Sequence, residues 1–281
     1  MTDAGTLVRA LTQRFAAAGI DTARLDARLL VAEVLAVAPD RVALDPGLAV
    51  TAEQAGRIEA LAVRRAAREP VSHILGRRGF WTLNLKVTAD TLDPRGDTET
   101  LVEAVLARIP DRAAPLRLMD FGTGTGAIVL ALLSELPNAT AIAVDKSPAA
   151  LAVARDNASA HGLDGRIRFV LSHWGAALDE RADVIVSNPP YIPDQDIDGL
   201  APEVAAYEPR LALAGGPDGL DCYRELVPQM ARLLVPGGLA AVEVGAGQAP
   251  QVAALFQAAG LRDIAFACDL GGVERCVMGT A

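Results

Sequence analysis

The regular alternation of short β-rich runs with segments of helical spacing, which begins at Leu116, limits what this chain can fold into. Parallel strands need long crossover connections, usually helices, so this alternation is typical of a parallel sheet covered by helices. The β-rich runs are residues 116–121, 140–145, 166–171, 183–187, 239–244, 264–268 and 273–278. The last two leave no room for a helix between them, so we expect the sheet to finish with an antiparallel hairpin.

The N-terminal part of the chain has a different pattern. Between residues 6 and 68, apolar side chains recur every three or four positions, which predicts a small helical domain. Thr51, followed by Glu53 and Gln54, predicts a capped helix start. We expect the arginines of this helix on its exposed faces, as either a solvated surface or a binding surface. These arginines are Arg57, Arg64, Arg65 and Arg68.

A short segment of period two separates this region from the α/β part. Residues 79–90 place apolar side chains at alternate positions, which indicates a β-hairpin. Helical spacing returns at residues 97–109. We therefore expect a helical domain at residues 1–75, a β-hairpin linker at 76–96 and an α/β domain at 97–281.

Composition and charge oppose several classes of protein. The chain of 281 residues has a net charge of −9, which argues against binding nucleic acid directly through its phosphates. Its apolar stretches fall short of the ~20 residues of a membrane-spanning helix, and residues 1–15 lack the pattern of an export signal. We therefore expect a cytoplasmic protein that does not use the membrane. The three cysteines and three histidines follow no metal-ligand spacing, so no metal is expected.

A glycine-rich turn follows the first β-rich run. It consists of Gly122, Thr123, Gly124, Thr125 and Gly126. Glycines let the backbone approach a ligand closely at the start of a helix, although tight turns also use glycine for geometry alone. The glycines occupy every second position, which does not match the GxGxxG of pyrophosphate-binding turns. S-adenosylmethionine (SAM), which has no phosphate, fits this turn better than NAD does.

Three further residues are candidates for the same cofactor site. Asp145 ends the second run about 20 residues further on, where a carboxylate can accept hydrogen bonds from both ribose hydroxyls. Its alternative role is to cap the helix that begins near Pro148. Asp120 can reach the amino acid part of the cofactor directly or through water. Trp174 can stack beside the adenine, although a lone tryptophan is more often a core residue.

The motif Asn188-Pro189-Pro190-Tyr191 follows the fourth run directly. Two prolines fix the backbone and remove donors, which leaves carbonyl oxygens at the edge where open α/β sheets bind ligands. The Asn188 side-chain oxygen and the Pro189 carbonyl can then accept both N–H bonds of a planar amide or amino group, and Tyr191 can pack on it. A purely structural turn is the alternative. The sequence thus predicts direct in-line methyl transfer to nitrogen, because no dedicated base is evident.

Other segments accompany these motifs. They are 69–76 (Glu-Pro-Val-Ser-His-Ile-Leu-Gly), Phe80-Trp81, Asp97-Thr98-Glu99, Tyr207-Glu208-Pro209, 218–221 (Asp-Gly-Leu-Asp) and 269–272 (Asp-Leu-Gly-Gly). With them the chain resembles, over nearly its whole length, the HemK/PrmC family of protein-(glutamine-N5) methyltransferases that modify peptide-chain release factors. Asn-Pro-Pro-Tyr alone is shared with adenine-N6 DNA methyltransferases.

The resemblance implies a Rossmann-like, seven-stranded SAM-dependent methyltransferase sheet, preceded by a helical domain that docks the protein substrate. It implies SAM as cofactor and, as substrate, the glutamine in the GGQ motif of a release factor. The implied cofactor-binding residues are Gly122, Thr123, Gly124, Thr125, Gly126, Asp145, Trp174 and Asn188. The implied catalytic residues are Asn188, Pro189 and Tyr191. The implied substrate-binding residues are Asn188, Pro189, Pro190, Tyr191 and Ile192.

The chain departs from the family's pattern at three positions. Asp93 and Gly96 stand in a segment that usually reads Leu-Ile-Pro-Arg-Pro-Asp-Thr-Glu, and His173 stands where an acidic residue is frequent. Three other functions stay open: methylation of a ribosomal-protein glutamine, methylation of adenine in DNA, and SAM binding without turnover. The acidic charge and the lack of an evident DNA-recognition insert argue against methylation of DNA. The intact Asn-Pro-Pro-Tyr motif argues against a protein that binds SAM without turnover.

Overall fold

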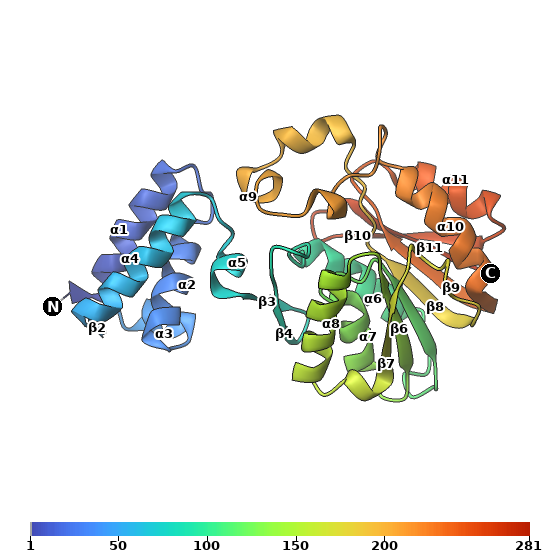
Figure 1. Ribbon diagram of the computed structural model, residues 1–281, viewed down its shortest axis with the longest axis horizontal. Coiled ribbons are helices and arrows are strands. Elements are labelled where there is room, and N and C mark those ends of the chain that lie inside the picture. Colours follow the sequence, from blue (N-terminus) through green and yellow to red (C-terminus); the bar gives the residue numbers. More distant parts are fainter. Residues whose placement is uncertain (1) are drawn as a thin grey trace. The chain divides into compact units, whose positions relative to one another are not determined.

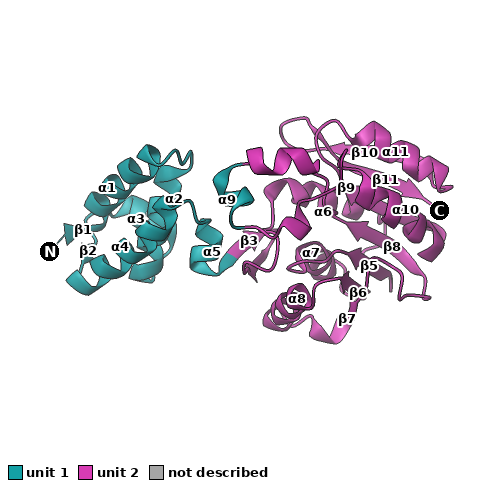
Figure 2. Ribbon diagram, turned by 45° about the horizontal axis from the view of Figure 1, so that its top comes forward, with its two compact units in different colours: residues 1–77, 201–207 teal, residues 78–200, 208–281 magenta. Residues whose placement is uncertain are grey.

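The computed structural model describes residues 2–281, which form two compact units. The first unit contains the N-terminal residues up to Arg77 together with Ala201–Tyr207. The second contains Arg78–Leu200 and Glu208–Ala281. Figure 2 shows the two units in different colours. The sequence pattern did not indicate that residues 201–207, which follow the Asn-Pro-Pro-Tyr motif, belong with the N-terminal helices.

The first unit is helical and has its own core. Its helices are α1 (Ala4–Ala17), α2 (Ala23–Leu35), α3 (Pro39–Leu44), α4 (Ala52–Ala66), α5 (Val71–Leu75) and α9 (Pro202–Ala205), and β1 (Thr2–Asp3) pairs with β2 (Ala49–Val50). Large side chains such as Phe15, Leu30 and Ile58 are buried in the core. Thr51 and Gln54 form a reciprocal capping box at the start of α4, which confirms the expected helix start. The expected helical domain is therefore present.

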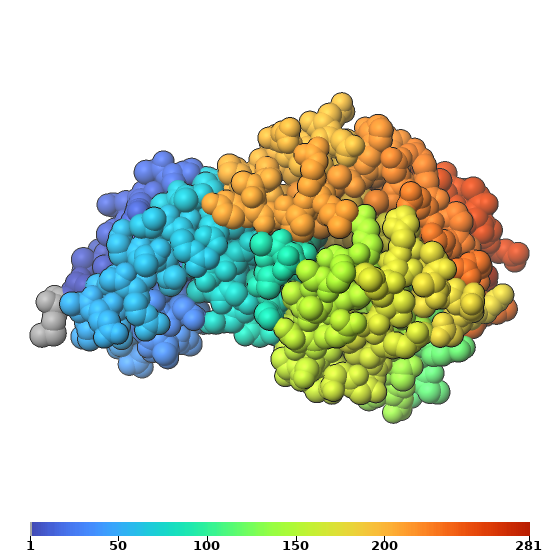
Figure 3. Space-filling view, in the orientation of Figure 1, coloured from blue at the N-terminus to red at the C-terminus, as the bar shows by residue number. Residues whose placement is uncertain are grey.

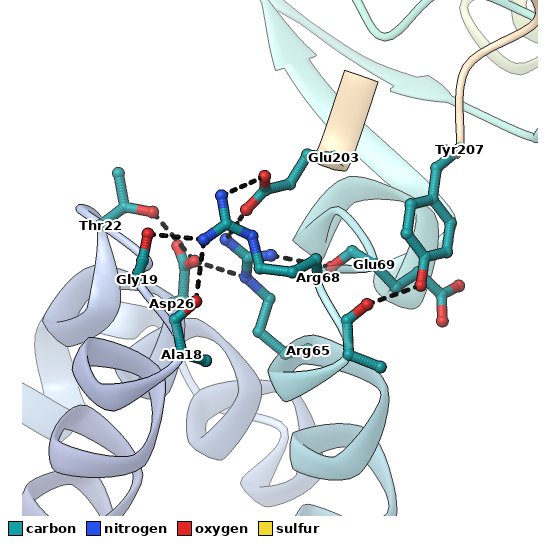
Figure 4. Close-up of polar contacts among 10 residues, drawn as sticks. Ala18, Gly19, Thr22, Asp26, Arg65, Arg68, Glu69, Glu203 and Tyr207 are labelled. Atoms are coloured by element: carbon teal, nitrogen blue, oxygen red, sulfur yellow. Dashed lines mark hydrogen bonds and ion pairs between the residues drawn. The ribbon is translucent and has the colours of Figure 1, made fainter. Parts of the chain in front are cut away.

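Two of the arginines expected on an exposed helix face are turned inward, so that expectation was wrong for them. Arg65 is buried and bonds Asp26 at 2.7 Å and Glu203 at 3.0 Å. Arg68 also pairs with Glu203, at 2.6 Å. Figure 4 shows both arginines beside Glu203. Charged side chains are almost never buried without a partner, and here Asp26 and Glu203 supply it.

These arginines hold the segment Ala201–Tyr207 within the helical unit. Glu203 accepts from both guanidinium groups, and those ion pairs lower its pKa against the effect of burial. The Tyr207 hydroxyl donates to the Ala67 carbonyl oxygen at 2.8 Å. A sequence window cannot reveal this role of Arg65 and Arg68, because their partner lies more than a hundred residues away along the chain.

The second unit is built on a mostly parallel sheet. Its strands are β5 (Arg117–Phe121), β6 (Thr140–Asp145), β7 (Ile167–Leu171), β8 (Ala182–Ser187), β9 (Leu234–Glu243), β10 (Arg262–Cys268) and β11 (Glu274–Thr280), in the order β10-β11-β9-β8-β5-β6-β7. The strands β5 to β9 are parallel, while β11 is antiparallel to both β9 and β10. All seven expected runs are strands, and the terminal antiparallel hairpin is confirmed.

Helices cover both faces of this sheet (Figure 1). The helices are α6 (Glu99–Ala107), α7 (Ala127–Glu135), α8 (Pro148–Ala160), α10 (Asp221–Leu233) and α11 (Ala249–Ala258), with short 3-10 turns at Gly96–Thr98, Asp164–Arg166, Asp194–Gly199 and Arg210–Ala212. One buried cluster joins α6, α7 and α8 to the sheet, and a second joins α10 and α11. Alternate residues of a strand enter different clusters, since Leu118 lies in the first and Met119 in the second.

The predicted hairpin lies at the start of the second unit. Strand β3 (Arg77–Phe80) pairs with β4 (Leu83–Lys86) in a two-stranded sheet. Phe80 and Leu85 are fully buried in the same cluster as α6 and α7. The hairpin therefore contributes to the core of the α/β unit. Among the described residues, no helix has both the length and the apolar character needed to span a membrane.

Candidate methyltransferase site

The order of the strands places two of the predicted motifs side by side. The chain runs outward from β5 to β6 and β7, and then returns to place β8 on the other side of β5. Ligands of open α/β sheets bind beyond the carboxyl ends of the strands at such a switch point. The glycine-rich turn follows β5 and Asn188 follows β8, so both lie at this edge.

A pocket of the α/β unit opens at this edge. Its lining comes from six segments that are remote in sequence: residues 90–98, 122–128, 145–150, 172–174, 188–190 and 209–212. Of the predicted site residues, it includes Gly122, Thr123, Gly124, Thr125, Asp145, Trp174, Asn188 and Pro190. Gly126, Pro189, Tyr191 and Ile192 are not among its lining residues. Leu211, on one wall, is 52% exposed, and the segment around it lies at the surface (orange in Figure 3).

The glycine-rich turn needs its glycines for geometry and for space. Gly122, Gly124 and Gly126 all have positive φ angles, of 71°, 55° and 83°. A Cβ atom on Gly122 would lie 3.3 Å from the Trp174 ring, whereas around Gly124 there is nothing within 4 Å. The turn is fixed because the N–H groups of Gly122 and Thr123 both donate to the Val144 carbonyl. The open space beside Gly124 is therefore part of the pocket.

Asp145 supports the same turn. Its Oδ2 atom accepts from the Gly124 N–H and its Oδ1 atom from the Ser147 N–H, both at 2.9 Å. The cap of α8 is Ser147, whose hydroxyl accepts from the Ala150 N–H. A carboxylate has about four acceptor positions, so Asp145 retains capacity for ligand hydroxyls in the pocket that it lines.

Asp120 lies behind the turn and outside the pocket lining. It is 1% exposed, and its Oδ2 atom accepts from the Thr123 hydroxyl at 2.7 Å. Burial raises the pKa of Asp120 to about 7. Its Oδ1 atom is buried and lacks a well-aligned hydrogen-bond partner among the described residues, and the Val129 N–H acts weakly on this carboxyl. Asp120 does not line the pocket, and in this structure its carboxyl supports Thr123. Its reach to a cofactor, directly or through water, stays a prediction.

Trp174 forms one wall of the pocket. Its backbone has a positive φ of 49°, and its side chain is 6% exposed in the cluster with α10 and α11. The indole N–H donates to Glu225 at 3.2 Å, which fixes the ring. His173 also lines the pocket, and its Nε2 atom lies 3.3 Å from the same carboxylate.

Asn188 has a defined orientation. Its Nδ2 atom donates to the Thr98 hydroxyl at 3.2 Å, and the residue lines the pocket. Among the described residues, no donor reaches its Oδ1 atom or the Pro189 carbonyl oxygen. The preceding Ser187 is fully buried and donates to the Phe121 carbonyl, which joins the end of β8 to the end of β5.

The end of the motif is anchored away from the pocket. The Tyr191 hydroxyl lies 3.4 Å from Glu243, and the Tyr191 carbonyl accepts from the Gln248 side chain at 2.9 Å. Ile192 donates to the Leu213 carbonyl and accepts from the Gly215 N–H. These bonds fix the backbone that carries Asn188. Contact of Tyr191 and Ile192 with the substrate stays a prediction.

The pocket also includes residues to which the sequence reasoning gave no role. Arg95 and Thr98 line it, and Arg95 pairs with Glu208. Burial raises the pKa of Glu208 to about 7. The Glu208 carboxyl also accepts a hydrogen bond from the backbone of Asp93, one of the residues that differ from the family's pattern. Thr98 belongs to the Asp97-Thr98-Glu99 segment, which contributes to the family resemblance but does not by itself predict a role in a site. Glu243 does not line the pocket, and the sequence pattern does not predict a role for it, because it ends a run of apolar strand residues.

The buried acids predict how stability depends on pH. Burial raises the pKa of Asp120, Glu208 and Glu243 to about 7 from ordinary values of 3.8 and 4.5. The folded protein therefore keeps protons that the unfolded chain has lost, so we expect the free energy of unfolding to fall as pH rises from about 4 to about 7. The lowered pKa of Asp218, caused by Arg224, acts only at lower pH.

Denaturant unfolding across this pH range measures the slope. Asp120→Asn removes one of the titrating groups and retains an oxygen for Thr123, so its slope should be flatter than that of the unmodified protein. Asp179→Asn, at an exposed position, is the matched control and should leave the slope unchanged. A stability that rises with pH over this interval would contradict the assignment.

Comparison with known proteins identifies the family of this chain. The chain matches the PrmC N-terminal domain at residues 6–76 and the methyltransferase small domain at residues 90–205. It is 50% identical to the release factor glutamine methyltransferase of Rhodospirillum rubrum, over 94% of this chain and 81% of that protein. It is 46% identical to the protein of the same name from Caulobacter vibrioides, over 98% of this chain and 96% of that one.

A solved structure shows the same fold. A methyltransferase from Pyrococcus furiosus superposes with a TM-score of 0.51, at 15% identity, over 79% of this chain and 96% of that one.

Among the described residues, no group of three or more histidine, cysteine, aspartate or glutamate side chains could hold a metal ion. The Rossmann-like methyltransferase fold, the pocket and the similarity over nearly the whole chain agree, and the chain belongs to the family of release factor glutamine methyltransferases.

Proposed function

We propose that this protein transfers a methyl group from SAM to the N5 side-chain amide of the GGQ-motif glutamine in a peptide-chain release factor. The family supports glutamine methylation, since the relatives that share 46–50% of the sequence are named release factor glutamine methyltransferases. The orientation of Asn188 carries the proposal, because its Nδ2 atom is engaged by Thr98 while its Oδ1 atom remains available to accept.

The pocket residues fit SAM. The open space at Gly124 would receive the part of the cofactor closest to the backbone, and the remaining acceptor capacity of Asp145 suits the ribose hydroxyls. The Trp174 ring would form an apolar wall beside the adenine. Bound SAM supplies an electrophilic methyl group on its sulfonium.

Asn188 and Pro189 would hold the glutamine. A primary amide presents two N–H donors in one plane, and the Asn188 Oδ1 atom and the Pro189 carbonyl are two acceptors on adjacent residues. Both acceptors are fixed before the substrate arrives, which orients the weakly nucleophilic nitrogen and stabilises positive charge that develops on it. Orientation of bound reactants can contribute ~7–11 kcal/mol to lowering the barrier. As the nitrogen–methyl bond forms, the methyl–sulfur bond breaks, and the methylated amide then releases one of its N–H protons to solvent.

Label transfer tests the proposal. The protein is incubated with methyl-labelled SAM and a purified release factor, and the labelled residue is located by mass spectrometry. We expect one methyl group on the GGQ glutamine and none in a release factor whose GGQ glutamine is replaced by alanine. Label on a ribosomal protein or on DNA adenine, with none on the release factor, would overturn the proposed substrate.

The helical unit is proposed to dock the release factor. Every residue assigned to SAM lies in the α/β unit, and the helical unit has a core of its own. A single glutamine offers few contacts, so contacts remote from the reacting group are needed to hold a protein substrate in register.

Hydrogen exchange tests this docking role. We expect added release factor to slow amide exchange in parts of residues 2–77, while a short GGQ-containing peptide leaves those amides unchanged. The kcat/KM value for the whole release factor should also exceed that for the peptide. Equal kcat/KM values, with no protection in the helical unit, would contradict the role.

A further inference from the structure

A buried carboxyl lies directly behind the Asn-Pro-Pro-Tyr motif. Glu243 is the last residue of β9 and is 1% exposed. Strand β9 lies parallel to β8, and Val242 is in register with Ser187, the residue before Asn188. Glu243 therefore ends its strand beside the start of the motif. Its Oε2 atom lacks a well-aligned hydrogen-bond partner among the described residues, and an unsatisfied buried acceptor is costly.

Thr98 connects this carboxyl with Asn188. The Thr98 hydroxyl accepts from the Asn188 Nδ2 atom at 3.2 Å. The same hydroxyl is near enough to the Glu243 side chain to act on its pKa, which it lowers as a donor to the carboxylate. A hydroxyl has a single proton to donate. When Thr98 directs that proton to a Glu243 carboxylate, its oxygen lone pairs face Asn188, and only the Nδ2 side of the Asn188 amide can bond to it.

We propose that Glu243 is a positioning residue for methyl transfer, which acts through the Thr98 hydroxyl to present the Oδ1 atom of Asn188 to the substrate amide. If the Thr98 proton pointed at Asn188 instead, the Asn188 amide would turn over and offer an N–H donor to the N–H donors of the glutamine. Tyr191 donates to the same carboxyl from the other end of the motif, at 3.4 Å. This inference rests on the proposed function, because it assigns a task to Asn188 in glutamine methylation.

The surroundings of Glu243 make the network sensitive to pH. Burial raises the pKa of Glu243 to about 7, while Thr98, Tyr191 and the charge of Arg275 lower it and Asp97 raises it. The other titratable groups that face it are the Tyr223 phenol and the Cys276 thiol, whose own pKa values are raised by burial. Below pH 7 Glu243 gains a proton, can donate to Thr98, and no longer fixes the direction of the Thr98 hydroxyl. We expect kcat to fall as pH drops through about 7.

Two Thr98 variants separate the hydroxyl from the space that it fills. Thr98→Val removes the hydroxyl at similar size, and Thr98→Ser keeps it. We expect Thr98→Val to lower kcat by about 10- to 100-fold, as for loss of a hydrogen bond at a charged group, with little change in the KM for release factor or in SAM affinity. Thr98→Ser should stay close to the unmodified protein. Equal kcat values for the two variants would overturn the proposal.

Glu243→Gln tests the carboxylate itself. It should lower kcat and abolish the fall in kcat below pH 7. Combined with Thr98→Val, it should cost little more than either change alone, because both changes break one chain of hydrogen bonds. Additive losses, or a pH profile that Glu243→Gln leaves unchanged, would show that Glu243 acts elsewhere. SAM binding and thermal unfolding establish that each variant is folded.

A readout without turnover keeps this test separate from the proposed function. In protein labelled with ¹⁵N-asparagine, the side-chain NH2 signals of Asn188 are identified by their absence in Asn188→Ala. We expect these signals to shift with a midpoint near pH 7, to lose that shift in Glu243→Gln and to retain it in Thr98→Ser. If the unmodified protein does not methylate the release factor, the proposed substrate fails, and these signals still decide the positioning role. Signals that do not respond to pH would overturn it.

Discussion

Asn188→Ala is expected to lower kcat for glutamine methylation by about 10²–10³-fold, the typical cost of removing one preorganised group at a reacting centre. The Asn188 side chain is held by Thr98, so the unmodified protein has its acceptor in place before the substrate binds. Truncation to alanine removes that acceptor and leaves the Pro189 carbonyl alone. Single-turnover transfer from SAM to the release factor isolates the chemical step.

The control for this variant is Asn138→Ala. Asn138 is an exposed asparagine in the loop between α7 and β6; it donates to the Ala113 carbonyl and does not line the pocket. We expect it to leave single-turnover transfer unchanged. Asn188→Ala must also bind SAM and unfold at a temperature similar to that of the unmodified protein. A folded Asn188→Ala protein that transfers methyl groups at a normal rate would remove Asn188 from the mechanism.

Asp145→Ala is expected to weaken SAM binding by about 10- to 150-fold, which corresponds to ~1.5–3 kcal/mol for hydrogen bonds to a charged group. Two effects add in this variant. It removes the acceptor proposed for the ribose, and it releases the N–H groups of Gly124 and Ser147 that Asp145 now fixes. Calorimetric titration with SAM measures the affinity directly.

Asp145→Asn separates the two effects. Asparagine keeps the shape and one oxygen, so it can still hold one of the two backbone N–H groups, but it has fewer acceptor positions for the ribose. We expect an affinity between those of Asp145→Ala and the unmodified protein. Asp179→Ala, at an exposed position, is the control for loss of an acidic side chain. Unchanged SAM affinity in a folded Asp145→Ala protein would place the adenosine elsewhere.

The strands of the sheet could be predicted because their signal is local. Every strand has apolar residues over a few positions, and all of them except β5 also contain β-branched residues. The glycines at positive φ mark the turn after β5. The absence of room for a helix after residue 268 was enough to predict the terminal hairpin. Strand β9 begins at Leu234, several residues before the expected run, because its first residues, which include Pro236 and Gly237, do not follow an apolar strand pattern.

The supporting residues of the site could not be predicted in the same way. Arg65 and Arg68 looked like an exposed basic surface, because the residue that pairs with both, Glu203, is remote in sequence. Thr98 and Glu243 meet only because a 3-10 turn and the end of β9 come together behind the motif. Periodicity describes one element at a time, whereas hydrogen-bond partners between elements are set by tertiary packing.

The segment Ala201–Tyr207 has a consequence for protein engineering. A chimera that exchanges the helical units of two relatives with one junction near Arg77 would keep the recipient's own residues 201–207 against the donor's helices, and with them the partner of Arg65 and Arg68. Residues 2–77 and 201–207 would have to be grafted together, with Arg65, Arg68 and Glu203 transferred as one set. If the helical unit docks the release factor as proposed, two-piece grafts of this kind should exchange release-factor preference while the α/β unit stays unchanged.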